Sequence, residues 1–258
     1  MIKKKHIYLF LFICFKLTSQ EYLPKSEGEI IRHKYYILSY NEDHEQANWV
    51  HYKLNPTFLN GTTPRINSFK VDPKVSTKSA ELIDYKGSGY DRGHLAPAGD
   101  MKYSRESMIE SFFMSNMSPQ DPSFNRGIWR RLEETIRKWG KSSEIFISTA
   151  GVLNIKNLGS IGGNKVTIPS KYYKVIYSPK NNSMIGFLLS NKGSSSELKS
   201  FMVSIDSIES ITGIDFFHEL PDEIENRLES KVNLKDWGFL FFIQKRQKCL
   251  KKDKKITN

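Results

Sequence analysis

The densest group of chemically capable residues lies at positions 90–101, which read YDRGHLAPAGDM. This segment places an acid, a cation and an imidazole close together, as Asp91, Arg92 and His94. A neutral histidine can take a proton from water, and a guanidinium can hold a phosphate through two parallel hydrogen bonds. Gly93 is expected to let the backbone turn closely between them. A structural histidine beside a surface Asp91–Arg92 ion pair is the alternative interpretation.

A second group of polar residues follows at helical spacing. Asn125, Trp129 and Glu133 recur every four residues, so a helix would bring the amide and the carboxylate about two turns apart on roughly one face. Oxygen donors suit Mg²⁺, which keeps several waters and often takes only one or two protein ligands. The same spacing fits a helix cap at Asn125 and a solvated Glu133. Spacing alone leaves the two interpretations open.

The elements that must position these residues are predicted from hydrophobic periodicity. The clearest helix runs from Phe124 to Gly140, where apolar residues recur every three or four positions, whereas residues 65–104 are rich in loops. Shorter helices are predicted over residues 197–204, 205–211 and 221–230, and strands over residues 35–40, 49–54, 144–149, 172–177 and 184–189. The last two strands should form a hairpin. We expect an α+β fold with a central, largely antiparallel sheet flanked by helices.

Composition limits the class of protein. The 258 residues carry 39 Lys and Arg against 28 Asp and Glu, a formal net charge of +11, and 38% of them are hydrophobic. That hydrophobic content supports a substantial core, so global disorder is excluded and no disulfide lattice is needed. Without repeats or a long linker, residues 21–244 should form one domain, followed by a solvated basic tail at residues 245–258 that attracts polyanions nonspecifically.

Residues 1–20 have the pattern of a secretory signal peptide. Lys3, Lys4 and Lys5 precede an apolar run that is about half the ~20 residues needed to span a bilayer, which disfavours an uncleaved anchor. The residues before Cys14 lack the small side chain usual ahead of a lipidated cysteine. We therefore expect export to the periplasm or the medium, with no membrane span in the mature chain. Cleavage would remove Cys14 and leave Cys249 without an internal disulfide partner.

Three motifs together resemble the DNA/RNA non-specific endonuclease family, whose members have the ββα-metal nuclease fold. They are YDRGHLAPAGDM, then SNMSPQ at residues 115–120, then FNRGIWRRLE at residues 124–133, in the family's order and spacing. The similarity extends more loosely from about Trp49 through TIPSKYYKVIY to TGIDFFHELPD. The signal peptide, the lead-in at residues 21–60 that precedes the motifs, and the basic tail would lie outside the region of similarity.

This resemblance implies a role for each matching residue. His94 matches the general base that activates water, and Asn125 matches the direct ligand of Mg²⁺, with Mn²⁺ as an alternative metal. Glu133 matches a catalytic acid that holds the metal through its water shell. Three arginines and two further residues match the groups that contact the phosphate and support the site: Arg92, which is also catalytic, Arg65, Arg137, Asp91 and Asn116.

The function implied is that of an exported, Mg²⁺-dependent endonuclease acting on both DNA and RNA. Contacts made mainly with phosphate and sugar carry little sequence information, so weak sequence preference is expected. Two alternatives use the same observations. One is a metal-dependent phosphodiesterase acting on small nucleotides, and the other is a non-catalytic nucleic-acid-binding protein of the cell envelope. The sequence gives no indication of the oligomeric state.

Overall fold

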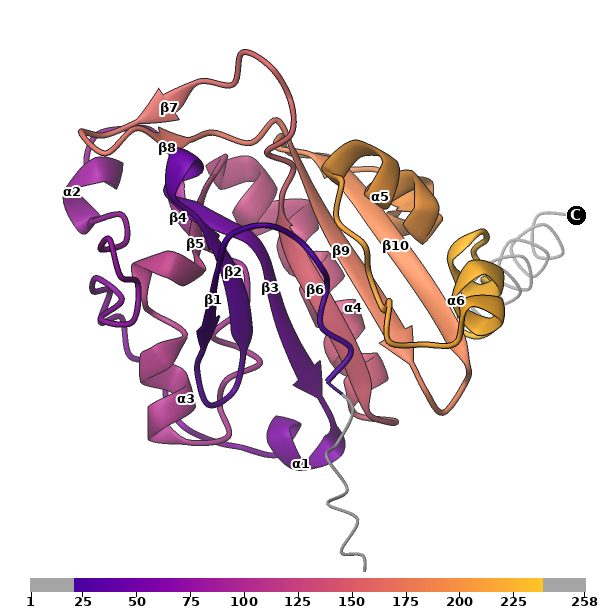
Figure 1. The fold of residues 1–258 in the computed structure, drawn as a ribbon. Helices are drawn as coiled ribbons and strands as arrows, with labels where there is room; N and C mark the ends of the chain where they lie inside the picture. The colour runs from indigo at the N-terminus through magenta and orange to yellow at the C-terminus, as the bar shows by residue number, and fades with distance from the viewer. Residues whose placement is uncertain (1–20, 239–258) are drawn as a thin grey trace, which may run out of the picture.

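The computed structural model describes residues 21–238, which build a seven-stranded sheet with helices on both sides (Figure 1). Every neighbouring pair in this sheet is antiparallel, so the predicted α+β class and the predicted hairpin are confirmed. The strands, in spatial order, are β1 (Glu29–Arg32), β2 (Ile37–Asn41), β3 (Gln46–Leu54), β6 (Ile145–Gly151), β9 (Lys171–Ser178), β10 (Ser183–Ser190) and β11 (Met202–Val203).

The helices form layers on the two faces of this sheet. In Figure 1, α4 lies behind β6 and β9, while α5 and α6 lie beside β10. The helices are α1 (Pro56–Leu59), α2 (Leu82–Tyr85), α3 (Arg105–Glu110), α4 (Arg130–Gly140), α5 (Ile205–Thr212) and α6 (Asp222–Glu229), with the short helical turns η1 (Glu42–His44), η2 (Met114–Asn116), η3 (Phe124–Trp129) and η4 (Leu198–Phe201). Two small antiparallel pairs complete the fold: β4 (Asp91–His94) with β5 (Met117–Gln120), and β7 (Ser160–Ile161) with β8 (Val166–Thr167).

Strand β9 shows why the middle of the sheet is apolar on both faces. Successive side chains of a strand point to opposite faces. Tyr172 packs against Trp129 at the start of α4, with ring centroids 5.8 Å apart, and its neighbour Tyr173 packs against Phe216 on the opposite side, at 5.6 Å. All four rings are buried. Because helical layers cover both faces, this strand is almost continuously buried instead of alternating.

The predicted helix over residues 197–204 is wrong. Only the 3₁₀ turn η4 forms there, and the chain then joins the sheet as β11, where Val203 pairs with Gly186 of β10. The Ser204 hydroxyl accepts a hydrogen bond from the amide of Ser207, so a new helix, α5, begins directly after β11. A free sheet edge and a strong N-cap therefore override the helical pattern. The predicted helices over residues 205–211 and 221–230 are confirmed as α5 and α6.

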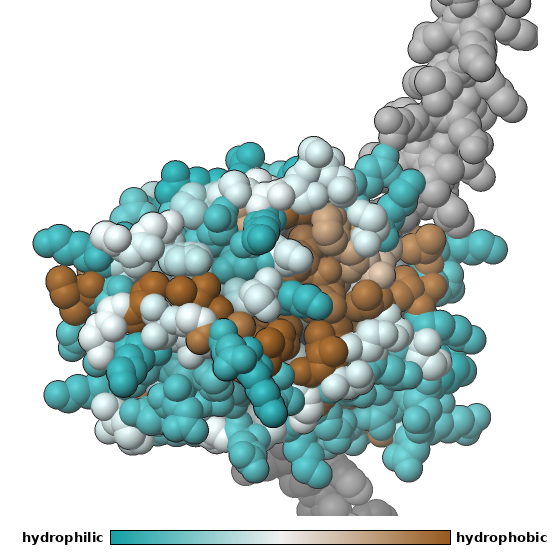
Figure 2. All heavy atoms as spheres, turned by 90° about the horizontal axis from the view of Figure 1, so that it is seen from above, coloured by the Kyte–Doolittle hydropathy of each residue, from teal (hydrophilic) through white to brown (hydrophobic). Residues whose placement is uncertain are grey.

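Hydrophilic side chains cover much of the face seen in Figure 2, and hydrophobic ones gather in a band across its middle. Leu82 and Ile83 of α2 are among the large hydrophobic side chains exposed on the protein. Within residues 21–238, no helix is long and apolar enough to cross a membrane. The predicted signal peptide at residues 1–20 and the predicted basic tail at residues 245–258 lie outside the described residues.

A buried ion pair ties the β1–β2 turn to the loop before α2. The imidazole Nε2 of His33 lies 2.8 Å from a carboxylate oxygen of Asp72, and neither side chain is exposed. The hydroxyl of Ser115, just before β5, donates to the same carboxylate at 2.5 Å. Glu110 at the end of α3 lies 3.8 Å from the other ring nitrogen. Three segments distant in sequence thus share one buried charge cluster.

We expect this cluster to make stability fall as the pH rises above neutrality. Burial lowers the pKa of His33, but the hydrogen bonds and charges of Asp72 and Glu110 raise it above its ordinary value of 6.5. The histidine therefore adds stability that is complete below pH 6.5 and is lost as the pH rises through the folded-state pKa. Urea unfolding from about pH 6 to about pH 9 measures this slope, which should flatten in His33→Gln.

The partner substitution provides the control. Asp72→Asn leaves His33 buried without its counter-charge, so it should cost about 3–5 kcal/mol of unfolding free energy at neutral pH. A pH slope in His33→Gln equal to that of the wild type would assign the dependence to other groups.

Candidate active site

The two-stranded sheet of β4 and β5 presents the DRGH motif, residues 91–94, to a cavity, which we call the DRGH cavity. Arg92 and His94 are two positions apart on β4, so their side chains point to the same face, and both line the cavity. Gly93 between them faces Gln120 of β5, and a Cβ on it would lie 2.2 Å from that side chain. The glycine is therefore required by close packing within a strand, and the turn expected at this position is wrong.

The cavity has a volume of about 650 Å³ and collects the predicted residues from four separate segments. The predicted site residues that line this cavity are Arg65, Arg92, His94, Asn125, Glu133 and Arg137. Three charged residues that the sequence analysis missed also line it: Arg126, Arg130 and Glu134. The missed arginines lie within the FNRGIWRRLE motif, and their position beside Asn125 was the available signal. Five arginines thus surround one histidine, one amide and two carboxylates.

His94 is held as a neutral imidazole. Burial, followed by the positive charges of Arg65 and Arg92, lowers its pKa to about 3. The ring hydrogen-bonds to the backbone of Arg92, and its Nε2 is buried with no hydrogen-bond partner among residues 21–238. Since a carbonyl only accepts, the bonded nitrogen carries the proton and Nε2 carries a free lone pair. The alternative of a fully satisfied structural histidine does not fit this geometry.

Aromatic rings form the walls around these groups. The His94 ring stands edge-on to Phe112 with centroids 4.8 Å apart. The guanidinium of Arg65 lies 4.9 Å from the centre of the same Phe112 ring, and that of Arg92 lies 4.4 Å from the centre of Phe69. Arg65 also donates to Asn67 at 2.8 Å. Stacking on rings holds the arginines in place while leaving most of their N–H groups free for a ligand.

Asn125 is fixed by a carboxylate behind the cavity. Its Nδ2 donates to Asp91 Oδ2 at 2.8 Å, and Arg126 donates to both oxygens of the same carboxylate at 2.8 and 2.6 Å. The predicted alternatives are thus wrong: Asp91 pairs with Arg126 and not with Arg92, and Asn125 does not cap the helix. Asp121 accepts from the amides of Ser123 and Phe124 at the helix start instead.

The helix that carries Asn125 and Glu133 is not continuous. Residues 124–129 form a π-helical turn, η3, in which Gly127 has the non-helical angles φ −104° and ψ −107°, and α4 begins only at Arg130. The prediction of one regular helix from Phe124 to Gly140 is therefore wrong in this turn. A glycine permits the kink, and π turns inside helices often occur at functional sites. Both predicted side chains nevertheless line the cavity.

Glu133 lies above a buried lysine that the sequence analysis did not identify. Lys174 of β9 has no solvent exposure; its Nζ donates to Thr149 Oγ1 at 3.2 Å and lies 4.6 Å from the centre of the Trp129 ring. Burial raises the pKa of the Glu133 carboxyl, and the positive charge of Lys174 counteracts this. A lysine inside the otherwise apolar run YYKVIY was the signal for it.

Arg137 and Asn116 are also anchored by the protein. Arg137 Nε donates to Asp100 Oδ1 at 2.5 Å, and Tyr52 donates to the other oxygen of that carboxylate at 3.2 Å. Asn116, fully buried, accepts from the amide of Ala96 at 2.8 Å and donates to the Ala96 carbonyl at 3.0 Å. It therefore fixes the chain just beyond His94, which is a supporting position.

The oxygen donors of the cavity fit a hard divalent cation. With the Asn125 amide nitrogen bonded to Asp91, its Oδ1 has no hydrogen-bond donor within residues 21–238 and is free to bind a ligand. The Glu133 carboxylate lines the same cavity. An amide oxygen with one carboxylate behind it suits Mg²⁺, which keeps most of its waters.

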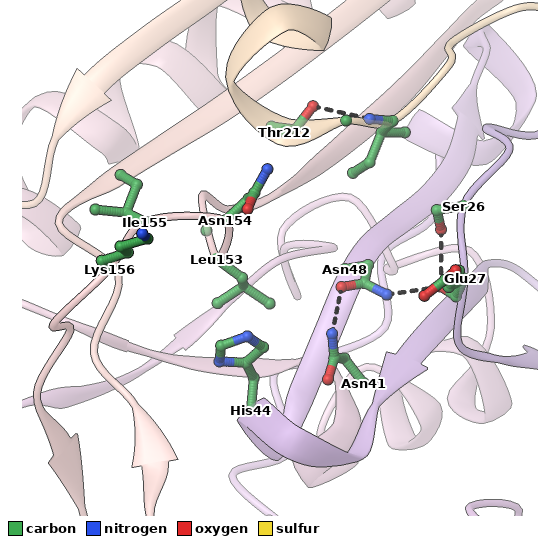
Figure 3. Close-up of a pocket in the computed structure, with 13 residues that line it drawn as sticks. Ser26, Glu27, Asn41, His44, Asn48, Leu153, Asn154, Ile155, Lys156 and Thr212 are labelled. Carbon is green, nitrogen blue, oxygen red and sulfur yellow. Dashed lines mark hydrogen bonds between the residues drawn. The ribbon is translucent and has the colours of Figure 1, made fainter.

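Another cavity, of about 490 Å³, lies on a different part of the molecule (Figure 3). Its amide groups bind one another and the backbone: Asn41 donates to Asn48 at 2.9 Å, and Asn48 donates to the carbonyl of Glu27 at 2.7 Å. Its lining contains one carboxylate, Glu27, and no arginine, in contrast to the arginine-rich DRGH cavity. The chemistry predicted from the sequence therefore belongs to the DRGH cavity.

Comparison with known proteins agrees with this arrangement. The chain is 32% identical to a nuclease of a Nostoc species over 84% of this chain and 81% of that protein, and 34% identical to a nuclease of Serratia marcescens over 80% and 81%. It is 35% identical to the mitochondrial nuclease EXOG of Mus musculus over 76% of this chain and 59% of that protein. A solved structure of an EndoG/EndoGI complex superimposes with a TM-score of 0.69 and 27% identity, covering 76% of this chain and 88% of that chain.

The fold is that of the ββα-metal nucleases, with β4, β5 and the η3–α4 helix forming the ββα unit. The model of the DNA/RNA non-specific endonuclease family matches residues 16–223. The lead-in is therefore part of the family region, and the expectation that it lies outside is wrong. Its strands β1 to β3 form one side of the main sheet. Sequence, fold and cavity together show that this chain belongs to the DNA/RNA non-specific endonuclease family.

Proposed function

We propose that this chain is an exported, Mg²⁺-dependent enzyme that cleaves DNA and RNA internally, with His94 as its general base and Asn125 as its direct metal ligand. Family membership makes it a nuclease that hydrolyses phosphodiester bonds. The metal, the residue roles and the location are the proposed part.

The state of His94 is the observation that carries the proposal. Its Nε2 is an unpartnered acceptor at the cavity, and the ring is neutral at any physiological pH. A group in this state can remove a proton from a water molecule as that water attacks phosphorus. The hydrogen bond to the Arg92 backbone orients the ring, so little reorganisation is needed before proton transfer.

The charged wall of the cavity supports a polyanionic substrate. Arg65, Arg92 and Arg137 are proposed to contact the phosphate oxygens and stabilise the charge that builds on them. Mg²⁺, when bound, supplies further positive charge to the phosphate and to the departing oxygen. Asn125 and, through water, Glu133 are the residues proposed to hold it. Asp91 holds the Asn125 side chain in position, and Asn116 holds the backbone that follows His94.

Export is proposed from residues 1–20 alone. Their basic start and short apolar run match a secretory signal peptide. The chain left after cleavage carries 35 Lys and Arg against 28 Asp and Glu, and its net charge of +7 suits a protein that meets nucleic acid outside the cell. Detection of a mature chain that begins near residue 21 in the periplasm or the medium would support this part of the proposal. Retention of the full-length chain inside the cell would contradict it.

Cleavage of supercoiled plasmid and of a structured RNA tests the catalytic proposal. We expect both to be fragmented with Mg²⁺ and left intact with EDTA. His94→Ala should lower kcat by about 10²–10⁴-fold without loss of folding, because the base acts only in the chemical step. Asn125→Ala should instead raise the Mg²⁺ concentration needed for half-maximal rate.

Arg131→Ala is the matched control, because Arg131 is exposed on the same helix, donates to the carbonyl of Ser196 and does not line the cavity. It should cleave at nearly the wild-type rate. Cleavage of small phosphodiesters alone would favour the phosphodiesterase alternative. Retention of nucleic acid without cleavage would favour the binding protein.

The pH profile should reflect the lowered pKa of His94. Since burial and the neighbouring arginines lower this pKa to about 3, the base form persists throughout the neutral and mildly acidic range. At saturating Mg²⁺, kcat should therefore show no fall near pH 6.5, the ordinary histidine value, that is attributable to this residue. An NMR titration of the His94 ring checks the assignment directly. Protonation near 6.5 would contradict it.

Arg126 is expected to act as a positioning residue for Asn125. Arg126→Ala removes both bonds to Asp91, so the Asn125 amide loses its fixed partner. We expect the Mg²⁺ concentration for half-maximal rate to rise several-fold, with a smaller change in kcat at saturating Mg²⁺. Arg126→Lys should restore part of the effect through a single contact. A change in KM for the nucleic acid with unaltered Mg²⁺ dependence would instead make Arg126 a substrate contact.

A further inference from the structure

Helices α5 and α6 both pack against β10 (Figure 1). Three acidic side chains from these two helices converge there. Asp206 and Glu209 are three positions apart on α5 and therefore share one face of that helix. Glu229 is the last residue of α6. One carboxylate oxygen from each residue lies within 4.8 Å of the other two. The three groups thus form a compact oxygen cluster that joins two helices.

The innermost member of this cluster is buried without compensation. Glu229 is only 5% exposed, and its Oε1 is inaccessible to solvent and has no hydrogen-bond partner in the described part of the chain, residues 21–238. Its carboxylate is directed at the oxygens of Asp206 and Glu209. Within residues 21–238, no lysine or arginine forms an ion pair with any of the three. An orphaned, buried carboxylate aimed at two further carboxylates requires a partner.

The surroundings increase the negative charge instead of offsetting it. Burial, then Glu209, Glu225 and Asp206 in decreasing order, raise the pKa of Glu229 to about 9. Burial also raises the pKa of Glu209 to about 7, although the amide of Phe216 donates to its carboxylate at 2.8 Å. His218 is the nearby group that partly counters the charge of Glu225. Without a cation, the cluster has to take up a proton that free carboxylates would release at neutral pH.

The spacing suits one cation in particular. Ca²⁺ binds oxygen at about 2.3–2.6 Å and tolerates irregular geometry, so two donors on opposite sides of the ion lie at most about 5 Å apart. Separations within 4.8 Å therefore allow all three carboxylates to reach one Ca²⁺. Mg²⁺ needs shorter, near-octahedral contacts and gives up its waters reluctantly. Oxygen-only donors also disfavour softer metals.

We propose that Asp206, Glu209 and Glu229 bind a Ca²⁺ ion that clamps α6 to α5, at a site separate from the catalytic cavity. None of the three residues lines the DRGH cavity. Glu229 also lies beyond residue 223, where the family match ends, so this site does not follow from family membership. Its role is structural: the ion neutralises the buried charge and fastens the last helix of the described chain.

Thermal unfolding of the purified full chain, with EDTA or with added CaCl₂, tests this proposal. At a Ca²⁺ concentration about ten times the dissociation constant, Tm should rise by about 3–6 °C. Asp206→Asn should remove this rise, and its exposed position makes it compatible with folding. Asp222→Asn, at the start of α6 and outside the cluster, is the matched control and should respond like the wild type.

Two further variants separate this site from the catalytic metal and from a mere proton. Asn125→Ala should keep the Ca²⁺-dependent rise in Tm, and calorimetry should still count one bound Ca²⁺ ion. The double variant Asn125→Ala/Asp206→Asn should bind none. Glu229→Gln should raise Tm in EDTA, since folding no longer has to protonate this buried carboxyl, and should abolish the response to Ca²⁺. The absence of any rise in the wild type, an equal rise in Asp206→Asn, or loss of the rise in Asn125→Ala would each overturn the proposal.

Discussion

The carboxylate of Asp91 is the contact on which the geometry of the site depends. It accepts from the amide of Asn125 and from two nitrogens of Arg126, and so it links strand β4 to the π turn η3. Hydrogen bonds to a charged acceptor are strong and directional, so this carboxylate fixes the rotation of the Asn125 side chain. The free amide oxygen then lines the same cavity as His94, which lies three residues further along β4.

Two electrostatic environments exist side by side in this cavity. His94 is surrounded by arginines and aromatic rings, which keep it neutral. Burial raises the pKa of the Glu133 carboxyl, and the positive charges of Lys174 and Arg137 counteract this. A site that moves one proton and holds one cation is expected to contain a deprotonated base close to a carboxylate that positive groups keep charged. His94 and Glu133 are two groups of this kind in the cavity.

The sequence located the residues of the cavity better than the contacts that support them. Spacing alone left the interpretation of Asn125 and Glu133 open, and the resemblance to the family's motifs singled out His94, Asn125 and Glu133. Their partners were not predictable in this way: the Asp91–Arg126 contact spans 35 positions, and Lys174 reaches the site from a strand that reads as plain core. Gly93 was recognised as special for the wrong reason, since only the structure reveals the approach of Gln120.

The helices and strands show the same contrast between what a local sequence pattern predicts and what tertiary contacts decide. Strands and helices with strong periodicity were predictable, whereas residues 197–204 were not, because pairing of Val203 with Gly186 at the sheet edge outweighed a helical pattern. The kink at Gly127 was also hidden, since a glycine in a helical pattern indicates a weak point but not a π turn. Local preference thus fixed the isolated elements, and tertiary contacts decided where they end.

Chemical rescue of a histidine-free variant tests the central claim most directly. In His94→Gly, the single-turnover rate of plasmid cleavage at saturating Mg²⁺ should be severely reduced and should then rise in proportion to added neutral imidazole, with the Mg²⁺ dependence unchanged. That result would show that the missing function is proton removal at this position. Single-turnover cleavage by His94→Gly at the wild-type rate, without imidazole, would contradict the account.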